Sequence, residues 1–292
     1  MNYIEPVFRP PSEWKSYIFQ ITNGCSWNQC TFCEMYTAPQ KRFNFKPRDA
    51  YLKELENVSQ LTEQPRRIFL ADGDAMTLST RRLKQVLIDI REFLPSINRV
   101  TSYCLPRNII HKSVKELLEL RDLGLKMVYV GCESGDDEVL TKVSKGETFS
   151  STLEALQKLK AAGIKSSVMI LNGLGGQSLS HQHAVNSARL MNAAQPEYLS
   201  TLVVSFPTGK ARFQSSFPEF KPLTQNQLFQ EMEWLLSELD LKKTIFRSDH
   251  ASNYLVLKGV LGQDKEKLLN KVRSALTLPG TIPIRQEWQR GL

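Results

Sequence analysis

Short apolar segments alternate with longer amphipathic ones along the first two thirds of the chain. Six apolar, β-prone segments predict strands, and each is followed by residues that favour a helix. In the clearest helical segment, apolar residues recur at i, i+3, i+4, i+7 and i+11 from Leu83 to Leu94, which places them on one helix face. The strands are predicted at residues 17–22, 67–70, 99–103, 127–130, 165–171 and 198–205.

Polar residues at the starts of several helical segments predict where the helices begin. The pairs Ser113 and Glu116, Ser151 and Glu154, and Thr224 and Gln227 each match a capping box, in which two side chains satisfy amide donors of the first turn. The helices are predicted at residues 48–61, 80–94, 113–124, 151–163, 181–194 and 224–239. His181 and His183 fall at the start of the fifth helix and point in divergent directions, because they are two positions apart.

The regular alternation predicts the fold class. Strand and helix repeat at roughly 30-residue spacing, which calls for parallel strands joined by right-handed crossovers. Either an open doubly wound α/β sheet or a full or partial α/β barrel satisfies this pattern. Beyond about residue 208 the pattern loosens into an irregular loop at 210–221, a short strand near Ile245 and a helix at 263–276. We therefore expect an N-terminal lead-in at 1–15, a core domain at 16–207 and a short α/β extension at 208–292.

Composition excludes several classes of protein. Hydrophobic residues make up 41% of the 292 positions and charged residues 23%, which indicates a folded globular chain rather than a disordered one. The net charge of +8 attracts anions without specifying a nucleic-acid partner, since a solvated basic face is equally consistent with it. No apolar run has the length of a signal peptide or a membrane helix, so the sequence predicts a cytoplasmic protein with no membrane partner.

Three of the five cysteines lie within nine residues, at Cys25, Cys30 and Cys33. An odd number of clustered cysteines does not suit a disulfide framework. A short loop can present three thiolates to one metal centre, and these gaps of four and two residues suit iron–sulfur ligation. Structural zinc is the alternative, but it requires a fourth ligand, and none of the histidines has finger-like spacing. The third interpretation is that the three cysteines are buried thiols that bind no metal.

The cysteine loop resembles that of the radical S-adenosylmethionine (SAM) superfamily. The usual family motif is Cys-x3-Cys-x2-Cys, and this chain has one residue more between the first two cysteines. Phe32, the aromatic residue directly before the last cysteine, also matches. The resemblance implies a partial (β/α)6 TIM-like barrel with a short extension. It further implies one [4Fe-4S] cluster bound by Cys25, Cys30 and Cys33, with SAM on the fourth iron.

Three loops that follow predicted strands carry further matches to the family. Asp72-Gly73-Asp74-Ala75 resembles the Gly-Gly-Glu motif that holds the SAM amino group, with Asp74 in the acidic place. Gly131-Cys132-Glu133-Ser134-Gly135 resembles a motif of coproporphyrinogen-oxidase-like and methylthiotransferase-like members, in which the glutamate contacts the SAM ribose. A glycine-rich loop follows the fifth strand, where backbone can approach adenine closely. The implied cofactor contacts are Gly73, Asp74, Glu133, Ser134, Asn172, Gly173 and Gly175.

Candidate substrate contacts come from two other places. Tyr103 ends the third predicted strand, and a polar stretch near the C-terminus resembles a tail of the same branch. Packing at Tyr103 and a hydrogen-bonded surface loop in the tail are the alternatives. The candidates are Tyr103, Arg247, Asp249, His250 and Asn253, and no catalytic residue is identified. Cys104 and Cys132 are expected to be packing residues, which leaves no ligands for a second cluster.

The resemblance implies reductive cleavage of SAM to a 5′-deoxyadenosyl radical that abstracts a hydrogen atom from a substrate. A small molecule is the favoured substrate, with RNA or a protein second, and the electron would come from a donor such as flavodoxin or ferredoxin. The alternative function is a non-enzymatic iron–sulfur redox sensor or nucleic-acid-binding module. Only the first hypothesis predicts that the protein binds and cleaves SAM.

Overall fold

The computed structural model describes residues 3–207, 210–278 and 280–291. Residue 208, where the predicted extension begins, lies outside this part, and the predicted division into lead-in, core and extension stays a prediction. Contacts between residues divide the chain into two units. Unit 1 contains Met1–Asn28, Cys33–Val130 and Glu154–Ser166, and unit 2 contains Gln29–Phe32, Gly131–Leu153 and Ser167–Leu292. Each unit is described by itself.

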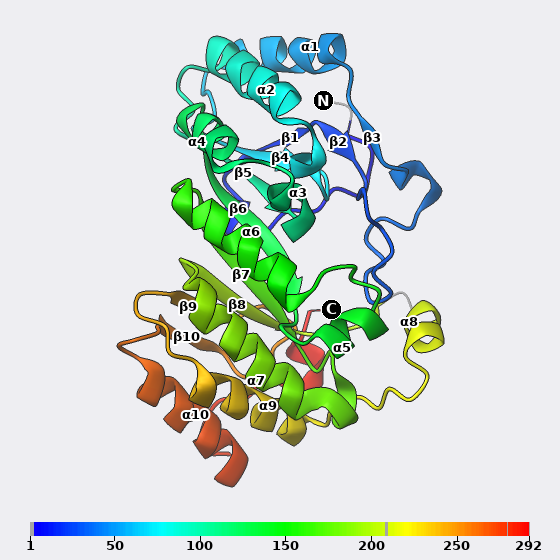
Figure 1. The fold of residues 1–292 in the computed structure, drawn as a ribbon, viewed down its shortest axis with the longest axis vertical. Helices are drawn as coiled ribbons and strands as arrows, with labels where there is room; N and C mark the ends of the chain where they lie inside the picture. Colours follow the sequence, from blue (N-terminus) through cyan, green and yellow to red (C-terminus); the bar gives the residue numbers. More distant parts are fainter. Residues whose placement is uncertain (1–2, 208–209, 279, 292) are drawn as a thin grey trace. The chain divides into compact units, whose positions relative to one another are not determined.

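Parallel strands form the centre of unit 1. They are ordered β1-β4-β5-β6, and every adjacent pair is parallel. Helix α2 packs against both α1 and α4 (Figure 1). The elements are β1 (Tyr17–Gln20), α1 (Arg48–Ser59), β4 (Arg67–Ala71), α2 (Thr80–Phe93), β5 (Arg99–Cys104), α4 (Val114–Asp122) and β6 (Leu125–Glu133), whose last three residues belong to unit 2.

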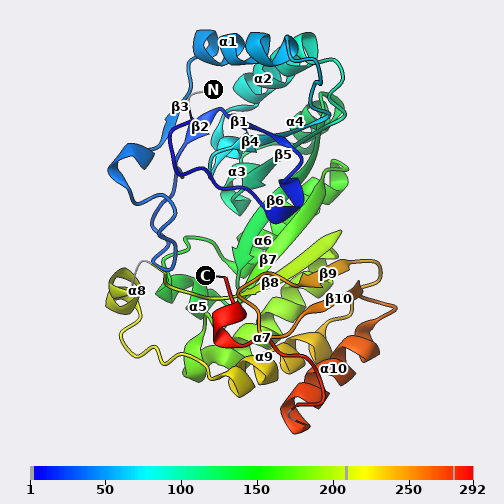
Figure 2. The ribbon, with the colours of Figure 1, turned by 180° about the vertical axis from the view of Figure 1, so that it is seen from behind.

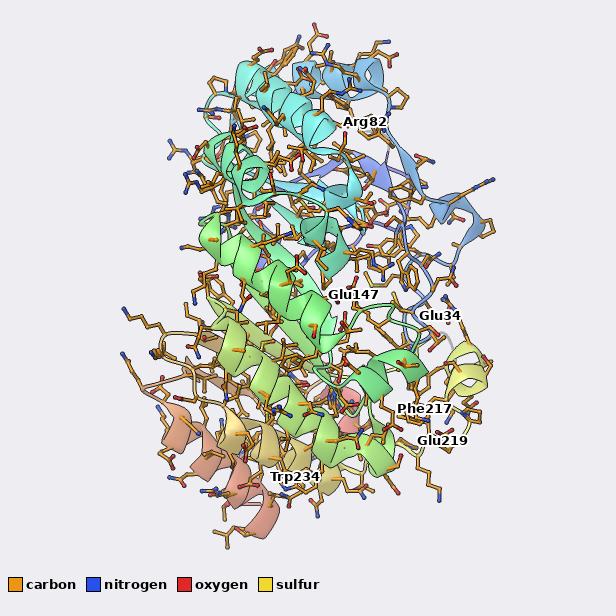
Figure 3. The ribbon with its side chains drawn as sticks, in the orientation of Figure 1. Glu34, Arg82, Glu147, Phe217, Glu219 and Trp234 are labelled. Carbon is orange, nitrogen blue, oxygen red and sulfur yellow. The ribbon has the colours of Figure 1, made fainter. Side chains whose placement is uncertain are left out.

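Shorter elements of unit 1 shape the loops at the ends of its strands. Strand β2 pairs antiparallel with β3, and the cysteine loop follows β2 directly. These elements are η1 (Pro11–Glu13), β2 (Thr22–Asn23), η2 (Pro39–Lys41), β3 (Asn44–Phe45), η3 (Ala75–Thr77) and α3 (Pro106–Ile110). Arg82 of α2, labelled in Figure 3, places its guanidinium 5.3 Å from the ring centre of Phe45 in β3.

The strands of unit 2 are ordered β7-β8-β9-β10. The pairs β7–β8 and β8–β9 are parallel, whereas β9–β10 is antiparallel. Helix α9 packs against α7 and α10, and α10 also packs against β10 (Figure 2). The elements are α5 (Asp137–Lys142), α6 (Phe149–Ala161), whose residues from Glu154 on belong to unit 1, β7 (Lys165–Asn172), whose first two residues also belong to unit 1, α7 (Gly176–Ala194), β8 (Tyr198–Val203), α8 (Ala211–Ser216), α9 (Gln225–Glu238), β9 (Ile245–Ser248), β10 (Leu257–Val260), α10 (Lys265–Thr277) and η4 (Glu287–Gln289).

The predicted α/β class with six parallel strands is confirmed, because the six strands expected from the sequence are β1, β4, β5, β6, β7 and β8. The apolar face predicted for α2 is confirmed too, since the five residues that define it are each at most 1% exposed. Burial of side chains of this size stabilises a fold by about 1.5–3 kcal/mol each. The five are Leu83, Val86, Leu87, Ile90 and Leu94.

Some predicted boundaries were wrong. Helix α6 begins at Phe149, not Ser151, because Thr148 and Ser151 exchange hydrogen bonds between their side chains and backbone amides. Helix α7 begins at Gly176, so His181 and His183 lie inside the helix rather than at its start. The short elements α3, α5, α8 and β10 were not predicted. Among the described residues, no helix is both long enough and apolar enough to cross a membrane.

The capping box of α4 provides a prediction about stability. Glu116 N donates to Ser113 Oγ at 3.2 Å, and Ser113 N donates to Glu116 Oε2 at 2.8 Å. Replacing Ser113 with alanine is expected to lower the free energy of unfolding by about 1 kcal/mol, because an amide of the first turn loses its acceptor. Urea unfolding measures the change. The control is Ser59→Ala at the C-terminal end of α1, where the hydroxyl donates to the carbonyl of Glu56, and an equal loss in both variants would contradict the role of the cap.

Candidate functional site

The cysteine loop contributes to both units. Cys25 and Cys33 belong to unit 1, whereas Cys30, which is 9% exposed, belongs to unit 2. Asn28, in the longer gap between the first two cysteines, has a φ of +44° and donates from Nδ2 to the carbonyl of Tyr36 at 2.9 Å. This left-handed residue turns the loop where it is one residue longer than the usual family spacing.

All five cysteines are in the thiol form. In the described part of the chain, the cysteine thiols do not form a group of three or more Cys, His, Asp or Glu side chains that could hold a metal ion. The chemistry of the donor set fits an iron–sulfur cluster, since thiolates are the usual protein ligands of such clusters. Buried polar and charged side chains of the neighbouring loops suit a polar, charged cofactor bound beside such a cluster.

Asp74 is a buried carboxylate of unit 1. It follows β4, its side chain is fully buried, and its Oδ2 accepts a hydrogen bond from Ser26 in the cysteine loop. The other oxygen, Oδ1, has no hydrogen-bond partner among the described residues. Burial raises the pKa of this carboxyl to about 6, although the hydrogen bond from Ser26 and the charges of Lys112 and Arg107 oppose the rise. A buried acceptor without a donor is a place where a cationic ligand would bind favourably.

The ring of Tyr36 lies against Gly73 in unit 1. A Cβ on Gly73 would come within 2.6 Å of Tyr36 Cζ, so only glycine fits beneath the ring. Burial raises the pKa of the Tyr36 phenol, and the negative charge of Asp72 adds to the rise. The Tyr36 hydroxyl also lacks a hydrogen-bond partner in the described chain.

A buried ion pair anchors the same loop. Lys41 Nζ forms a salt bridge with Asp72 Oδ2, and both side chains are fully buried. Lys41 also donates to the carbonyl of Ile4 at 2.8 Å. Asp72, which stands where the family motif has glycine, is therefore a structural partner of Lys41. Like Asp74, Asp72 has one buried oxygen, Oδ1, without a hydrogen-bond partner among the described residues, but its other oxygen is held by Lys41.

Tyr103 lies on β5 of unit 1, as predicted. Its ring packs edge-on against Phe69 at 5.0 Å and lies 6.3 Å from the ring of Tyr129. Burial raises the pKa of its phenol, and the charges of Tyr129, Asp72 and Cys33 add to the rise. Tyr103 therefore shares an interior region with Cys33 and Asp72.

Glu133 ends β6 and pairs with Lys145 in unit 2. The Lys145 ammonium lies 3.1 Å from Glu133 Oε1, and both side chains are almost completely buried. Burial opposes the charge of Lys145, but the Glu133 carboxylate and the Cys30 thiol hold its pKa above the usual value. Glu133 has a φ of +66°, a conformation that costs about 1–2 kcal/mol in residues other than glycine. Gly131 leaves room for the pair, because a Cβ there would lie 3.2 Å from Lys145 Nζ.

Ser134 and the glycine-rich loop are held by a buried network from α7 and α9. His183 Nδ1 lies 2.7 Å from Ser134 Oγ, and its Nε2 lies 3.1 Å from the carbonyl of Leu171 in β7. Glu231 of α9 accepts hydrogen bonds from Gly173 N at 2.6 Å and from Ser180 Oγ at 2.5 Å. Burial raises the pKa of the Glu231 carboxyl, opposed by His183 and these two donors.

Asn172 and the glycines after it take different positions. Asn172 Oδ1 is buried and has no hydrogen-bond partner among the described residues. It lines a cavity of about 20 Å³, large enough for one water molecule, together with residues of β8, β9 and α9. Gly173 has a φ of +84°, which favours glycine, and its amide is already bound to Glu231. A Cβ at position 175 would lie 3.1 Å from the backbone of Leu179, so glycine allows close packing there.

The four C-terminal candidates lie within β9 or shortly after it, and each has different surroundings. Asn253 is buried, and its amide holds β8, accepting from Val203 N at 2.9 Å and donating to Thr201 O at 2.8 Å. His250 bonds to Ser252 at 2.9 Å, and burial lowers the pKa of its imidazole. Asp249 forms a salt bridge of 2.8 Å with Lys258, and Arg247 is exposed on β9.

Four residues at these loops were not predicted from the sequence. Tyr36, Lys145, His183 and Glu231 reach the loops through contacts that no local motif encodes. One signal was available for Glu231, which is a carboxylate on the apolar face of α9, beside Leu228 and Met232. A charged residue on a buried helix face usually has a specific partner. Trp234, on another face of α9, packs against His181 at 4.9 Å (Figure 3).

Two curated proteins are similar to parts of this chain. A curated relative, the heme chaperone HemW of Bacillus subtilis (strain 168), is 25% identical over 183 residues, covering 60% of this chain and 47% of HemW. The tRNA uridine(34) acetyltransferase of Methanocaldococcus infernus is 26% identical over 110 residues, covering 38% of this chain and 20% of that protein. The chain thus spans less than half the length of these curated relatives.

Solved structures with the same fold include coproporphyrinogen III oxidase (HemN) from Escherichia coli, a radical SAM enzyme. Its TM-score is 0.55 at 16% identity, covering 78% of this chain and 54% of HemN. Methylornithine synthase (PylB) has a TM-score of 0.53 at 15% identity, covering 92% of this chain and 73% of PylB. These likenesses confirm the partial TIM-barrel-like fold. The family model described as the radical SAM superfamily matches residues 19–188, more than half of the sequence, and the chain belongs to that superfamily.

Proposed function

We propose that this radical SAM enzyme holds a [4Fe-4S] cluster through Cys25, Cys30 and Cys33 and directs its radical to a small molecule. Membership of the superfamily implies the cluster, SAM, a reductant and a substrate. When bound, the cluster and SAM supply a 5′-deoxyadenosyl radical that removes a hydrogen atom from the substrate. The observation that carries the proposal is the buried Asp74 carboxylate, whose Oδ1 has no partner in the described chain.

In unit 1, Asp74 would bind the SAM ammonium. A buried carboxylate with one open oxygen offers a charge-assisted hydrogen bond, which is roughly twice as strong as a neutral one. Ser26 fixes the other oxygen and so orients the open one. Gly73 and Tyr36 form the wall beside it, and the Tyr36 hydroxyl is a second polar atom available to a ligand.

In unit 2, the Glu133–Lys145 pair would bind polar parts of the cofactor. A carboxylate in a buried site needs a partner, and a ribose diol supplies two hydroxyl donors to Glu133. Lys145 has three donors and presents a cation beside Cys30, which suits the carboxylate that SAM carries. Ser134, Asn172, Gly173 and Gly175 complete the proposed contacts. Glu231 hydrogen-bonds to Gly173 and His183 hydrogen-bonds to Ser134, and these bonds hold the two loops in place.

The proposed substrate contacts differ in how available they are. Tyr103 shares the interior of unit 1 with Cys33, which places it well for a substrate of the radical. Charged or polar groups within β9 or shortly after it come from Arg247, Asp249 and His250. The Asn253 amide, by contrast, already binds the backbone of β8. An enclosed small molecule therefore remains the favoured class of substrate, with RNA or a protein as the second candidate.

Anaerobic reconstitution tests the function. The purified chain is loaded with iron and sulfide, reduced with dithionite and incubated with SAM, and 5′-deoxyadenosine is quantified by chromatography. We expect 5′-deoxyadenosine to accumulate slowly without substrate, and only in protein that shows a [4Fe-4S] spectrum. A chain that assembles the cluster but releases no 5′-deoxyadenosine would instead support an iron–sulfur sensor or nucleic-acid-binding module.

A further inference from the structure

The turn between Cys30 and Cys33 is attached to a distant part of unit 2. Thr31 N donates to the carbonyl of Val143, just after α5, at 3.0 Å. The Thr31 hydroxyl is hydrogen-bonded to the hydroxyl of Ser216, the last residue of α8, with 2.8 Å between the oxygens. Both residues between these cysteines, Thr31 and Phe32, therefore have specific contacts in unit 2.

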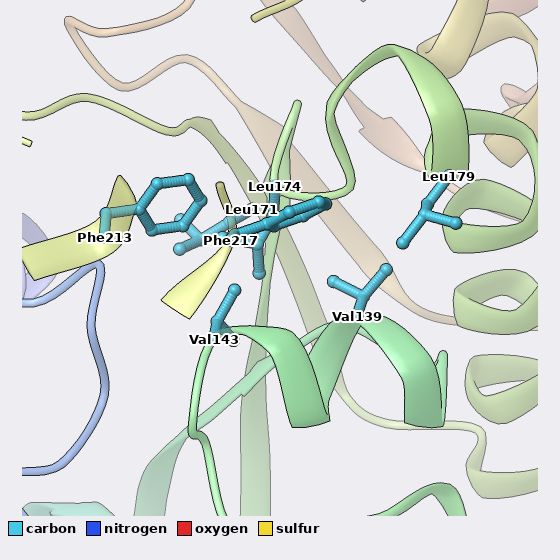
Figure 4. Close-up of a cluster of buried hydrophobic side chains, with 7 residues drawn as sticks. All are labelled: Val139, Val143, Leu171, Leu174, Leu179, Phe213 and Phe217. Atoms are coloured by element: carbon cyan, nitrogen blue, oxygen red, sulfur yellow. The ribbon is translucent and has the colours of Figure 1, made fainter. Parts of the chain in front are cut away.

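Phe32 packs against an apolar cluster built around α8. Its buried members come from α5, β7, α7 and the α8 segment, as Figure 4 shows for Val139, Leu171 and Phe213. Four rings, which we call the phenylalanine cluster, pack against one another in tilted and edge-on arrangements. Their ring centres are 4.6 Å apart for Phe206 and Phe213, and 4.7 Å apart for Phe213 and Phe220. The members of the phenylalanine cluster are Phe206, Phe213, Phe217 and Phe220.

A salt bridge fixes the phenylalanine cluster to α5. Lys142, at the end of α5, pairs with Glu219, and its ammonium lies 4.9 Å from the ring centre of Phe217. Figure 3 labels Phe217 and Glu219, which follow α8 directly. The α8 segment is thus held on one side by charge and on the other by the contacts of Thr31 and Phe32.

We propose that α8, through Ser216 and the phenylalanine cluster, holds the Thr31–Phe32 turn in place and thereby retains the iron–sulfur cluster. This inference rests on the proposed function. A cluster with three protein ligands depends on every thiolate staying in position, so motion of the turn between two of them would release iron. The aromatic rings also exclude water from this side of the turn, and solvent exposure is one of the factors that govern iron–sulfur sites.

The test compares two neighbouring serines. Ser216→Ala removes the bond to Thr31 and a bond within the helix to the carbonyl of Phe213, whereas Ser215→Ala removes the equivalent bond within the helix, from an exposed hydroxyl to the carbonyl of Arg212. Both variants are reconstituted anaerobically and exposed to air, and cluster loss is followed by visible absorption. We expect Ser216→Ala to lose its cluster about fivefold faster than wild type, from one hydrogen bond, and Ser215→Ala to match wild type. Ser216→Thr, which keeps the hydroxyl, should restore the wild-type rate.

A double-mutant cycle separates positioning from general destabilisation. Thr31→Val should speed cluster loss by about the same factor as Ser216→Ala, and the double variant should be no faster than either alone. Two results would overturn the inference and leave the proposed function standing. One is a double variant in which the two single effects on the rate of cluster loss multiply, and the other is an equal rate in Ser216→Ala and wild type. A wild-type chain that assembles no cluster at all would overturn both.

Discussion

Replacing Cys30 with alanine is expected to abolish the [4Fe-4S] spectrum and the release of 5′-deoxyadenosine. Three thiolates are the minimum protein ligand set proposed here, so loss of one leaves two irons without a protein ligand. The same result is expected for Cys25→Ala and Cys33→Ala. Iron and sulfide content and the electron paramagnetic resonance spectrum of the reduced protein measure the outcome.

The chain supplies matched controls for this experiment. Cys104 and Cys132 are buried, and burial raises the pKa of Cys132 to about 12, which keeps it a protonated thiol rather than a metal ligand. Cys104→Ala and Cys132→Ala should therefore retain the full cluster spectrum. A normal spectrum in Cys30→Ala, or its loss in Cys132→Ala, would show that the ligands are assigned wrongly.

Asp74→Asn is expected to weaken SAM binding roughly ten- to hundredfold, because a hydrogen bond to a charged group contributes about 1.5–3 kcal/mol. Equilibrium dialysis with the reconstituted protein measures the affinity without requiring turnover. Asp49→Asn, the same substitution at an exposed position in α1, is the control. Equal affinities in wild type and Asp74→Asn would remove Asp74 from the cofactor site.

The same substitution has an expected effect on stability. Burial raises the pKa of Asp74 from 3.8 to about 6, so the folded chain binds a proton more tightly than the unfolded chain. Ionisation of Asp74 therefore costs stability progressively as the pH rises from about 4 to 6. The stability of Asp74→Asn relative to wild type should rise by about 3 kcal/mol between pH 4 and pH 7, measured by urea unfolding without SAM. A difference that does not change with pH would show that Asp74 ionises normally.

The sequence predicted the strands because their signal is local. Six short apolar runs separated by amphipathic segments leave little choice of class, and the structure has these strands in sequence order. The start of α7 was missed because Gly175 and Gly176 look like a loop, although Gly176, with a φ of +60°, opens the helix. Helix α8 was missed because its six residues are too short for a periodic pattern.

The residues of the candidate site also fall into two groups, those with a local sequence signal and those that only tertiary contacts bring to the site. Asp74 and Glu133 could be proposed from the sequence because they lie at the ends of predicted strands within recognisable motifs. Lys145 and Glu231 could not, since what brings them to the site is tertiary contact with residues 12 and 58 positions away. The buried ion pair between Lys41 and Asp72 was also invisible in the sequence, because it joins residues 31 positions apart.

The bond between Thr31 and Ser216 joins residues 185 positions apart. A ribosome adds about 5–20 residues per second, so Ser216 is synthesised roughly 10–40 s after Thr31. During that interval all three cysteines of the loop already exist, but the helix that anchors their turn does not. Iron delivered to the nascent chain would meet an unanchored loop, which implies that stable loading follows the synthesis of α8.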